Sequence, residues 1–310
     1  MKMKNLLFSF LLLFSLSLSG CMTTSQDTRN GTRDNTPNVK IPEASGTKTI
    51  GNSKVTIDIS NSHEGYVIVK YEGDNPKVKV KIQNPNGDDP YIYTLKKTQN
   101  VFPLTGGNGR YAFYVYENVY NDEYSQLFYR SVDIKIKNLY SPYLYPNQYV
   151  NFNKDSLTVK KGKEIASKAD DDLDVVTDVY NYVVKNISYD DEKAQKIKDG
   201  KITDYIPDVD QILKIQKGIC FDYAAVMATM LRSQRIPTRM MIGYVTIDGN
   251  SIYHAWIGVY IEEIGWVDDF IEFDGKNWSI MDPTIISDNN NSKIKDFVKN
   301  QDNYLVKYLY

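Results

Sequence analysis

Short stretches in which apolar and polar residues alternate dominate residues 50 to about 140. The alternating apolar positions are Val55, Ile57 and Ile59, then Val78, Val80 and Ile82, then Val132, Ile134 and Ile136. A period of two is typical of a β-strand with one buried and one solvated face. Turn-forming clusters at 72–76, 84–87 and 106–109 separate these stretches. Strands at this spacing predict an all-β, sandwich-like domain over residues 50–150.

The pattern changes near residue 160. Apolar residues recur at helical spacing from Leu173 to Ile187, behind an acidic run at 170–172 that favours a helix start. The elements expected after this helix are a second helix from Cys220 to about Gln234 and strands over 240–247, 253–261 and 278–282. Helices followed by an antiparallel sheet predict an α+β domain over residues 151–310.

The first residues have the pattern of an export signal. Lys2 and Lys4 precede an apolar run over 6–18 that is too short to span a bilayer. The sequence then ends this segment with Leu-Ser-Gly-Cys at 18–21, which resembles the lipobox of bacterial lipoproteins. That resemblance implies cleavage of a signal peptide (1–20), lipidation of Cys21, and anchoring to the outer face of the bacterial cytoplasmic membrane. The alternative is ordinary secretory cleavage that leaves Cys21 as a free thiol.

Composition refines this picture. The polar segment 21–49 holds almost no apolar residue and is expected to be a flexible tether. The whole chain of 310 residues is 42% hydrophobic, which is enough for two folded domains. Cleavage after residue 20 removes two lysines and no acid, so the net charge of −2 becomes −4. Such a surface does not favour nucleic acid. The 25 tyrosines are better explained by half-buried strand faces than by carbohydrate binding.

Cys220 is the only cysteine besides Cys21. It follows Gly218, which marks a turn, and precedes a helix-forming run rich in Ala, Met and Leu. A cysteine at a helix N-terminus is placed where the helix dipole and free N–H groups stabilise a thiolate. The alternative is a buried cysteine that packs as a small hydrophobic residue.

His254 is one of two histidines, and the other, His63, lies in a predicted surface turn of the β-domain. Alternation places His254 on a strand, with Ala255, Ile257, Val259 and Ile261 on the opposite, core-facing side. Asp282 ends the next predicted strand, and antiparallel pairing of these strands would let its carboxylate orient the imidazole. By itself, Asp-Pro-Thr at 282–284 is also typical of a turn.

These pieces occur in an order that resembles the transglutaminase-like core. They are Gly-Ile-Cys at 218–220, the Ala-rich helix, Arg-Ile-Pro-Thr-Arg at 235–239, Gly-Tyr at 243–244, His-Ala-Trp at 254–256 and Asp-Pro-Thr at 282–284. The resemblance covers about residues 170–285. It implies a papain-like fold in which Cys220 is the nucleophile, His254 the base and acid, and Asp282 the orienting residue. Arg235 stands where the family usually has Gly, and a long excursion at 265–275 separates the His and Asp strands.

The resemblance implies chemistry on amide bonds through a thioester, either hydrolysis or acyl transfer to an amine. The expected partners are protein or peptide substrates, including cell-wall peptides. The alternative function is a non-catalytic binding or assembly module with a dormant triad. Tyr205 is a candidate oxyanion donor, or else a tyrosine of the cleft wall. No cofactor or metal ion is expected, because no known ligand spacing is present and the acidic residues within 268–274 are typical of a solvated loop.

Overall fold

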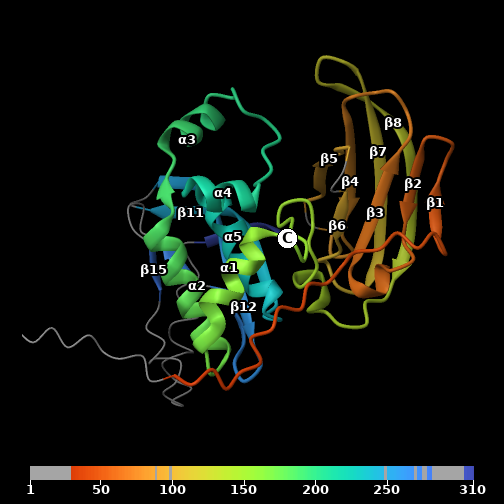
Figure 1. The fold of residues 1–310 in the computed structure, drawn as a ribbon. Coiled ribbons are helices and arrows are strands. Elements are labelled where there is room, and N and C mark those ends of the chain that lie inside the picture. Colours follow the sequence, from red (N-terminus) through yellow and green to blue (C-terminus); the bar gives the residue numbers. More distant parts are fainter. Residues whose placement is uncertain are drawn as a thin grey trace, which may run out of the picture.

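The structure is a computed structural model of the chain that describes residues 29–87, 89–97, 100–247, 250–268, 271–273, 278–280 and 304–310. Two of the predicted site residues, Cys21 and Asp282, lie outside the described residues. The described chain forms two lobes, one made of strands and one that combines helices with a sheet (Figure 1). The predicted α+β fold class is confirmed. None of the described helices has both the length and the apolar character needed to cross a membrane.

The strand-rich lobe contains two four-stranded sheets. Their strand orders are β1-β2-β3-β6 and β5-β4-β7-β8, and every pairing is antiparallel. The bounds are β1 Thr49–Gly51, β2 Val55–Asp58, β3 Tyr66–Tyr71, β4 Val78–Gln83, β5 Tyr91–Thr94, β6 Val101–Pro103, β7 Gly109–Tyr120 and β8 Glu123–Ile134. The apolar positions that the alternation singled out in β2 and β4 are buried, so the sandwich-like core follows from the pattern.

Tyrosines supply part of this core. Tyr93 of β5 and Tyr111 of β7 are fully buried. The ring of Tyr93 lies 4.3 Å from that of Phe102 on β6, which joins the two sheets. Tyrosine on the inner strand faces therefore accounts for some of its abundance, as expected.

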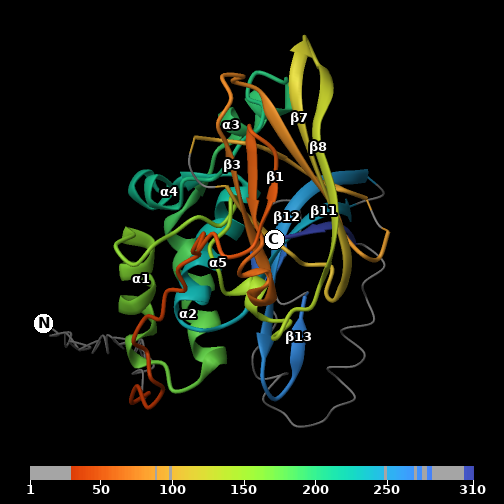
Figure 2. The same ribbon diagram turned by 90° about the vertical axis from the view of Figure 1, so that its right-hand side faces the viewer.

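The second lobe is built around one buried helix. Its helices are α1 Leu157–Ile165, α2 Asp172–Asn186, α3 Asp191–Lys198, α4 Val209–Ile215 and α5 Cys220–Ser233. Along the whole described chain, short 3-10 helices also occur at Ser62–Glu64, Ser141–Tyr143 and Ala166–Lys168. Asp171 caps α2 by accepting the N–H of Asp174 at 2.8 Å, as the acidic run indicated. Helix α5 begins at the predicted residue. It packs against α1, α2 and α4 on one side and against the sheet on the other (Figure 2).

The sheet of this lobe has the order β13-β12-β11-β16 and is antiparallel. Its strands are β11 Thr238–Ile247, β12 Asn250–Ile261, β13 Gly265–Val267 and β16 Tyr304–Leu309. Two smaller ladders join β9 Ser188–Tyr189 to β10 Lys217–Gly218 and β14 Ile271–Phe273 to β15 Trp278–Ile280. The sequence pattern had not indicated that the C-terminal strand β16 pairs with β11.

The antiparallel pairing that would bring Asp282 to the imidazole does not occur directly between the described strands. β15 pairs with β14, whereas β12 pairs with β11 and β13. Of the β14–β15 ladder, β14 approaches β12. The strands β13 and β14, which lie between β12 and β15 in the sequence, therefore supply nearer partners than β12 and β15 are to each other.

Residues 29–38 cross the helical lobe as a strap. Arg29 forms a salt bridge with Asp178 on α2 at 2.8 Å. Arg33 forms another with Asp172 at 2.6 Å, and the N–H of Asn38 donates to the carbonyl oxygen of residue 233 at 2.8 Å. The expectation of a flexible tether therefore does not describe these residues, because their polar side chains find fixed partners on the lobe. The other predicted domain boundaries stay predictions.

Arg235 has a backbone role as well as a side-chain role. Its φ angle is +69°, in the left-handed region that favours glycine at helix ends. Its guanidinium donates to the backbone carbonyl of Thr36 at 2.7 Å and to that of Asp34 in the strap. Arg235 thus adopts the backbone conformation that favours glycine and also binds the strap.

Candidate functional site

Cys220 is the first residue of α5, and it is 9% exposed. Gly218, which was expected to mark a turn, instead ends the short strand β10 two residues before the helix. A Cβ atom added at Gly218 would come within 2.6 Å of the Cβ of Asp222, so only glycine fits there without a shift. Glycine is therefore required by the close approach of Asp222.

The structure brings the start of α5 against β12 at the position of His254. The backbone N–H of Ala255, the residue after His254, lies close enough to the Cys220 sulfur to lower the pKa of the thiol. On the neighbouring residues, the rings of Phe221 and Tyr253 lie 6.4 Å apart. The imidazole is 5% exposed and is stacked at 6.3 Å on the ring of Trp256. The start of α5 and the strand segment that carries His254 thus lie against each other, and both the thiol and the imidazole are buried.

Burial keeps both groups in their neutral forms. Desolvation raises the pKa of the Cys220 thiol from 9.0 to about 11, against the opposing effect of backbone N–H groups of Ala255 and Phe221. Desolvation also lowers the pKa of His254 from 6.5 to about 4. The predicted helix start is present, yet the thiolate stabilisation expected from it is smaller than the cost of burying a charge. The resting pair is thiol and imidazole.

Beneath the thiol lies a buried polar network that the sequence reasoning missed. Asp222 is fully buried, and one of its oxygens accepts the N–H of Ile219 at 2.9 Å and the Nζ of Lys193 at 2.8 Å. The other oxygen accepts the hydroxyl of Tyr205 at 2.6 Å. An aspartate in the first turn of a helix was the available signal, because that position suits a carboxylate that accepts backbone N–H groups.

Tyr205, the candidate oxyanion donor, belongs to this network. Burial, followed by the charge of Asp222, raises the pKa of its hydroxyl far above the ordinary value of 10.0, so the proton is retained. That single proton is donated to Asp222, while Lys193 donates to the hydroxyl oxygen at 3.0 Å. Its hydroxyl is therefore engaged within the protein rather than directed toward a substrate oxygen.

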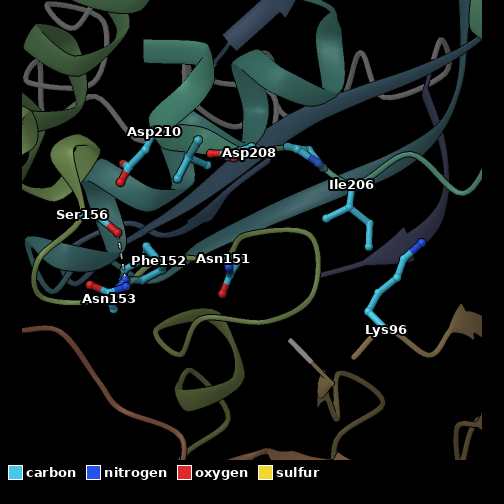
Figure 3. Close-up of a pocket in the computed structure, with 10 residues that line it drawn as sticks. Lys96, Asn151, Phe152, Asn153, Ser156, Ile206, Asp208 and Asp210 are labelled. Carbon is cyan, nitrogen blue, oxygen red and sulfur yellow. Dashed lines mark hydrogen bonds between the residues drawn. The ribbon is translucent and has the colours of Figure 1, made fainter. Parts of the chain in front are cut away.

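A separate cavity of about 410 Å³ opens next to the segment that follows Tyr205. Figure 3 shows polar side chains from 151–156 and 208–210 around it, with Lys96 of the strand-rich lobe on another side. Neither Cys220 nor His254 lines this cavity. It is distinct from the thiol site and lies where the two lobes meet.

The excursion after β12 contributes a charged and aromatic contact of its own. Asp268 forms a salt bridge with Arg239 at 3.0 Å. The same guanidinium lies 3.6 Å from the centroid of the Trp266 ring. Two other acidic residues of this excursion, Asp269 and Asp274, lie outside the described residues. The described residues contain no cluster of three or more side chains suited to hold a metal ion.

Comparison with known proteins identifies part of the chain. The Transglutaminase-like superfamily model (Transglut_core) matches residues 160–269, which include both Cys220 and His254. The UPF0252 protein MJ1282 of Methanocaldococcus jannaschii is 27% identical over 230 residues, which make up 70% of this chain and 65% of that protein. The uncharacterized protein YebA of Bacillus subtilis is 30% identical over 154 residues, 43% of this chain and 20% of that protein. The chain thus spans less than two thirds of the length of each relative.

Two solved structures align with the chain over much of its length. A putative cysteine protease from Cytophaga hutchinsonii aligns with a TM-score of 0.36 and 15% identity, over 76% of this chain and 78% of that one. The periplasmic domain of TgpA from Pseudomonas aeruginosa, bound to ethylmercury, aligns with a TM-score of 0.33 and 15% identity, over 70% and 95%. The family model thus shows that residues 160–269, which hold α2 to β13, are similar to the Transglutaminase-like superfamily.

Proposed function

We propose that this protein is an exported, lipid-anchored enzyme that cleaves or transfers amide bonds through a thioester on Cys220. His254 serves as base and acid, Asp282 orients the imidazole, and Cys21 carries the lipid. The observation that carries the proposal is the position of Cys220 at the start of α5, which packs against the strand of His254, with the N–H of Ala255 close enough to lower the pKa of the thiol. Similarity to the Transglutaminase-like superfamily supports a cysteine-dependent enzyme.

The neutral resting pair decides how the first step proceeds. As Cys220 attacks the substrate carbonyl, His254 accepts the thiol proton, and an S–C bond forms while the C–O double bond becomes an oxyanion. The Cys220 backbone N–H, in the first turn of α5, is the proposed oxyanion donor. Collapse expels the amine, which takes the proton from His254. The positive charge on His254 and the negative charge on the oxyanion then exist only while substrate occupies the site and excludes water.

The second half of the reaction determines the product. Water attacks the thioester for hydrolysis, or a second amine attacks it for transfer, and in both cases His254 accepts the proton of the incoming nucleophile and returns it to the departing thiolate. The same residues serve both reactions, so the acceptor that reaches the thioester decides between them. We propose protein or peptide substrates, including peptides of the cell wall, because the proposed anchor places the site outside the cytoplasm.

The proposal is tested by incubating the protein with casein and a fluorescent primary amine. Cys220→Ala is the matched control, because it removes only the sulfur. Amine incorporation that requires Cys220 identifies a transferase, and fragmentation that requires Cys220 identifies a protease. An acyl-enzyme trapped on Cys220 by acid quench supports the thioester in either case. Equal behaviour of the two proteins, with no acyl-enzyme on a broad peptide library, would refute the enzymatic proposal and favour the binding module.

A further inference from the structure

We propose that Lys193, Tyr205 and Asp222 form a positioning unit for the Cys220 thiol, and that the strand-rich lobe holds this unit in place through Lys79 and Asp204. The proposal rests on the proposed function, since it assigns residues that prepare the nucleophile of that reaction. It also gives the strand-rich lobe a role, which neither the sequence nor the family match supplies.

The unit is tied directly to the turn that carries the nucleophile. Asp222 accepts the N–H of Ile219, the residue before Cys220, at 2.9 Å, while its backbone continues in the first turn of α5. Its carboxylate therefore fixes both sides of Cys220. A fully buried carboxylate is costly unless it is paired and hydrogen-bonded. Lys193 and Tyr205 satisfy this requirement at 2.8 and 2.6 Å.

The unit also controls the charge near the sulfur. The negative charge of Asp222 is one of the effects that raise the pKa of Cys220. Lys193 has a side chain that is only 17% exposed, and it offsets that charge at close range. Loss of Lys193 or of the Tyr205 proton would leave a stronger negative field at the thiol. The other titratable groups that interact electrostatically with the thiol are Tyr253 from β12 and Tyr189 from β9.

A second ion pair connects the unit to the strand-rich lobe. Asp204, next to Tyr205, has a left-handed φ of +50° and pairs with the Nζ of Lys79 on β4 at 2.9 Å. The same Nζ donates to the hydroxyl of Thr94 on the adjacent strand β5 at 2.5 Å. In Figure 1 the segment between α3 and α4 extends toward this lobe. Lys79 thus anchors the residue that precedes Tyr205 and limits where its hydroxyl can lie.

The sign of the effect separates positioning from general loosening. Burial is the main cause of the raised pKa of Cys220, so a variant that merely opens the site lowers that pKa and speeds alkylation. A variant that removes the positive charge or the hydroxyl group that offsets the charge of Asp222 raises the pKa of Cys220 and slows its alkylation. Alkylation by iodoacetamide needs no substrate, so its outcome does not depend on whether the proposed function is correct.

The experiment measures iodoacetamide rates at pH 8.5 in the Cys21→Ser background, where Cys220 is the only cysteine. We expect Lys193→Met and Tyr205→Phe to react roughly three- to tenfold more slowly, as a stronger local negative charge requires. Lys193→Arg, which keeps the charge, is expected to restore most of the rate. A cooperative thermal unfolding transition above the assay temperature shows that each variant is folded. If Lys193→Met does not fold, the rate of Tyr205→Phe alone tests the positioning unit, because this variant removes only one hydroxyl group.

The role of the strand-rich lobe is tested by a double-mutant cycle. Lys79→Met is expected to slow alkylation by roughly two- to fivefold, the range for a partly exposed ion pair, and to have no further effect when Tyr205 is already Phe. Arg110→Met is the matched control, because it breaks an exposed pair with Asp133 on the same sheet. Rates equal to or faster than the parent in the Lys193 and Tyr205 variants would overturn the positioning unit. An effect of Lys79→Met that persists in the Tyr205→Phe background would overturn the link to the lobe.

Discussion

The neutral thiol-imidazole pair makes a quantitative prediction about the reactivity of Cys220. Its pKa rises from 9.0 to about 11, and each unit of pKa lowers the thiolate fraction tenfold at a pH below both values. At pH 7, Cys220 should therefore react about 100-fold more slowly than a free peptide thiol, before any steric protection is counted. Its rate should still rise tenfold per pH unit beyond pH 9, where the rate of a free thiol levels off.

The assay compares iodoacetamide modification of the Cys21→Ser protein with that of a peptide covering the Cys220 turn, from pH 5 to 10, by intact mass. The same protein in urea is the internal control, because unfolding removes the burial and should restore the rate of the peptide. The opposite result is a plateau of rapid modification from about pH 5 through neutral pH. Such a plateau would mean that thiolate and imidazolium exist together in the resting protein, and it would refute the neutral pair.

Three further predictions concern stability. Burial lowers the pKa of His254 from 6.5 to about 4, so the free energy of unfolding should fall by about 3 kcal/mol as the pH drops from 6.5 to 4. Urea unfolding of His254→Gln should therefore depend less on pH than that of the parent protein. An equal pH dependence in both proteins would contradict this prediction. Arg232 is fully buried and donates to the carbonyls of Thr238 and Tyr145. Arg232→Met should lower the free energy of urea unfolding by about 3 kcal/mol, because those acceptors lose their donor. A decrease of less than about 1 kcal/mol would show that the carbonyls find other donors. Arg235→Gly relieves about 1 kcal/mol of left-handed backbone strain and removes the contacts to the strap. The free energy of unfolding should therefore change little, while hydrogen exchange of the Asn38 amide becomes faster. An unchanged exchange rate would mean that the Arg235 side chain does not hold the strap.

The parts of the site that sequence could predict are those set by local patterns. The helix start at Cys220 follows from the Ala-rich run, and the strand of His254 follows from its alternating neighbours. Both depend on residues within a few positions of the site residue. The burial of the apolar stripe from Ala255 to Ile261 was predictable for the same reason.

The parts that could not be predicted depend on distant residues or on the balance of opposing effects. Asp222 meets Tyr205 and Lys193 across 17 and 29 residues of sequence, and no periodicity indicates such a contact. The helix dipole and burial act on the Cys220 thiol in opposite directions, and only the observed depth of burial shows which prevails. The pairing of β16 with β11 likewise joins strands far apart in the chain.

The strap changes what the proposed lipid anchor implies about the distance between the helical lobe and the membrane. A free segment over 21–49 would let the lobes stand far from the membrane, but Arg29 already forms a salt bridge with α2. An extended chain spans at most about 3.6 Å per residue, so the helical lobe would lie within about 30 Å of a lipidated Cys21. The site would then act on substrates at the membrane surface. Replacing Arg29 and Arg33 by Ser should release the strap and lengthen the distance from a dye on the helical lobe to labelled lipid in vesicles, measured by energy transfer. An unchanged distance would show that these contacts do not set the position of the enzyme.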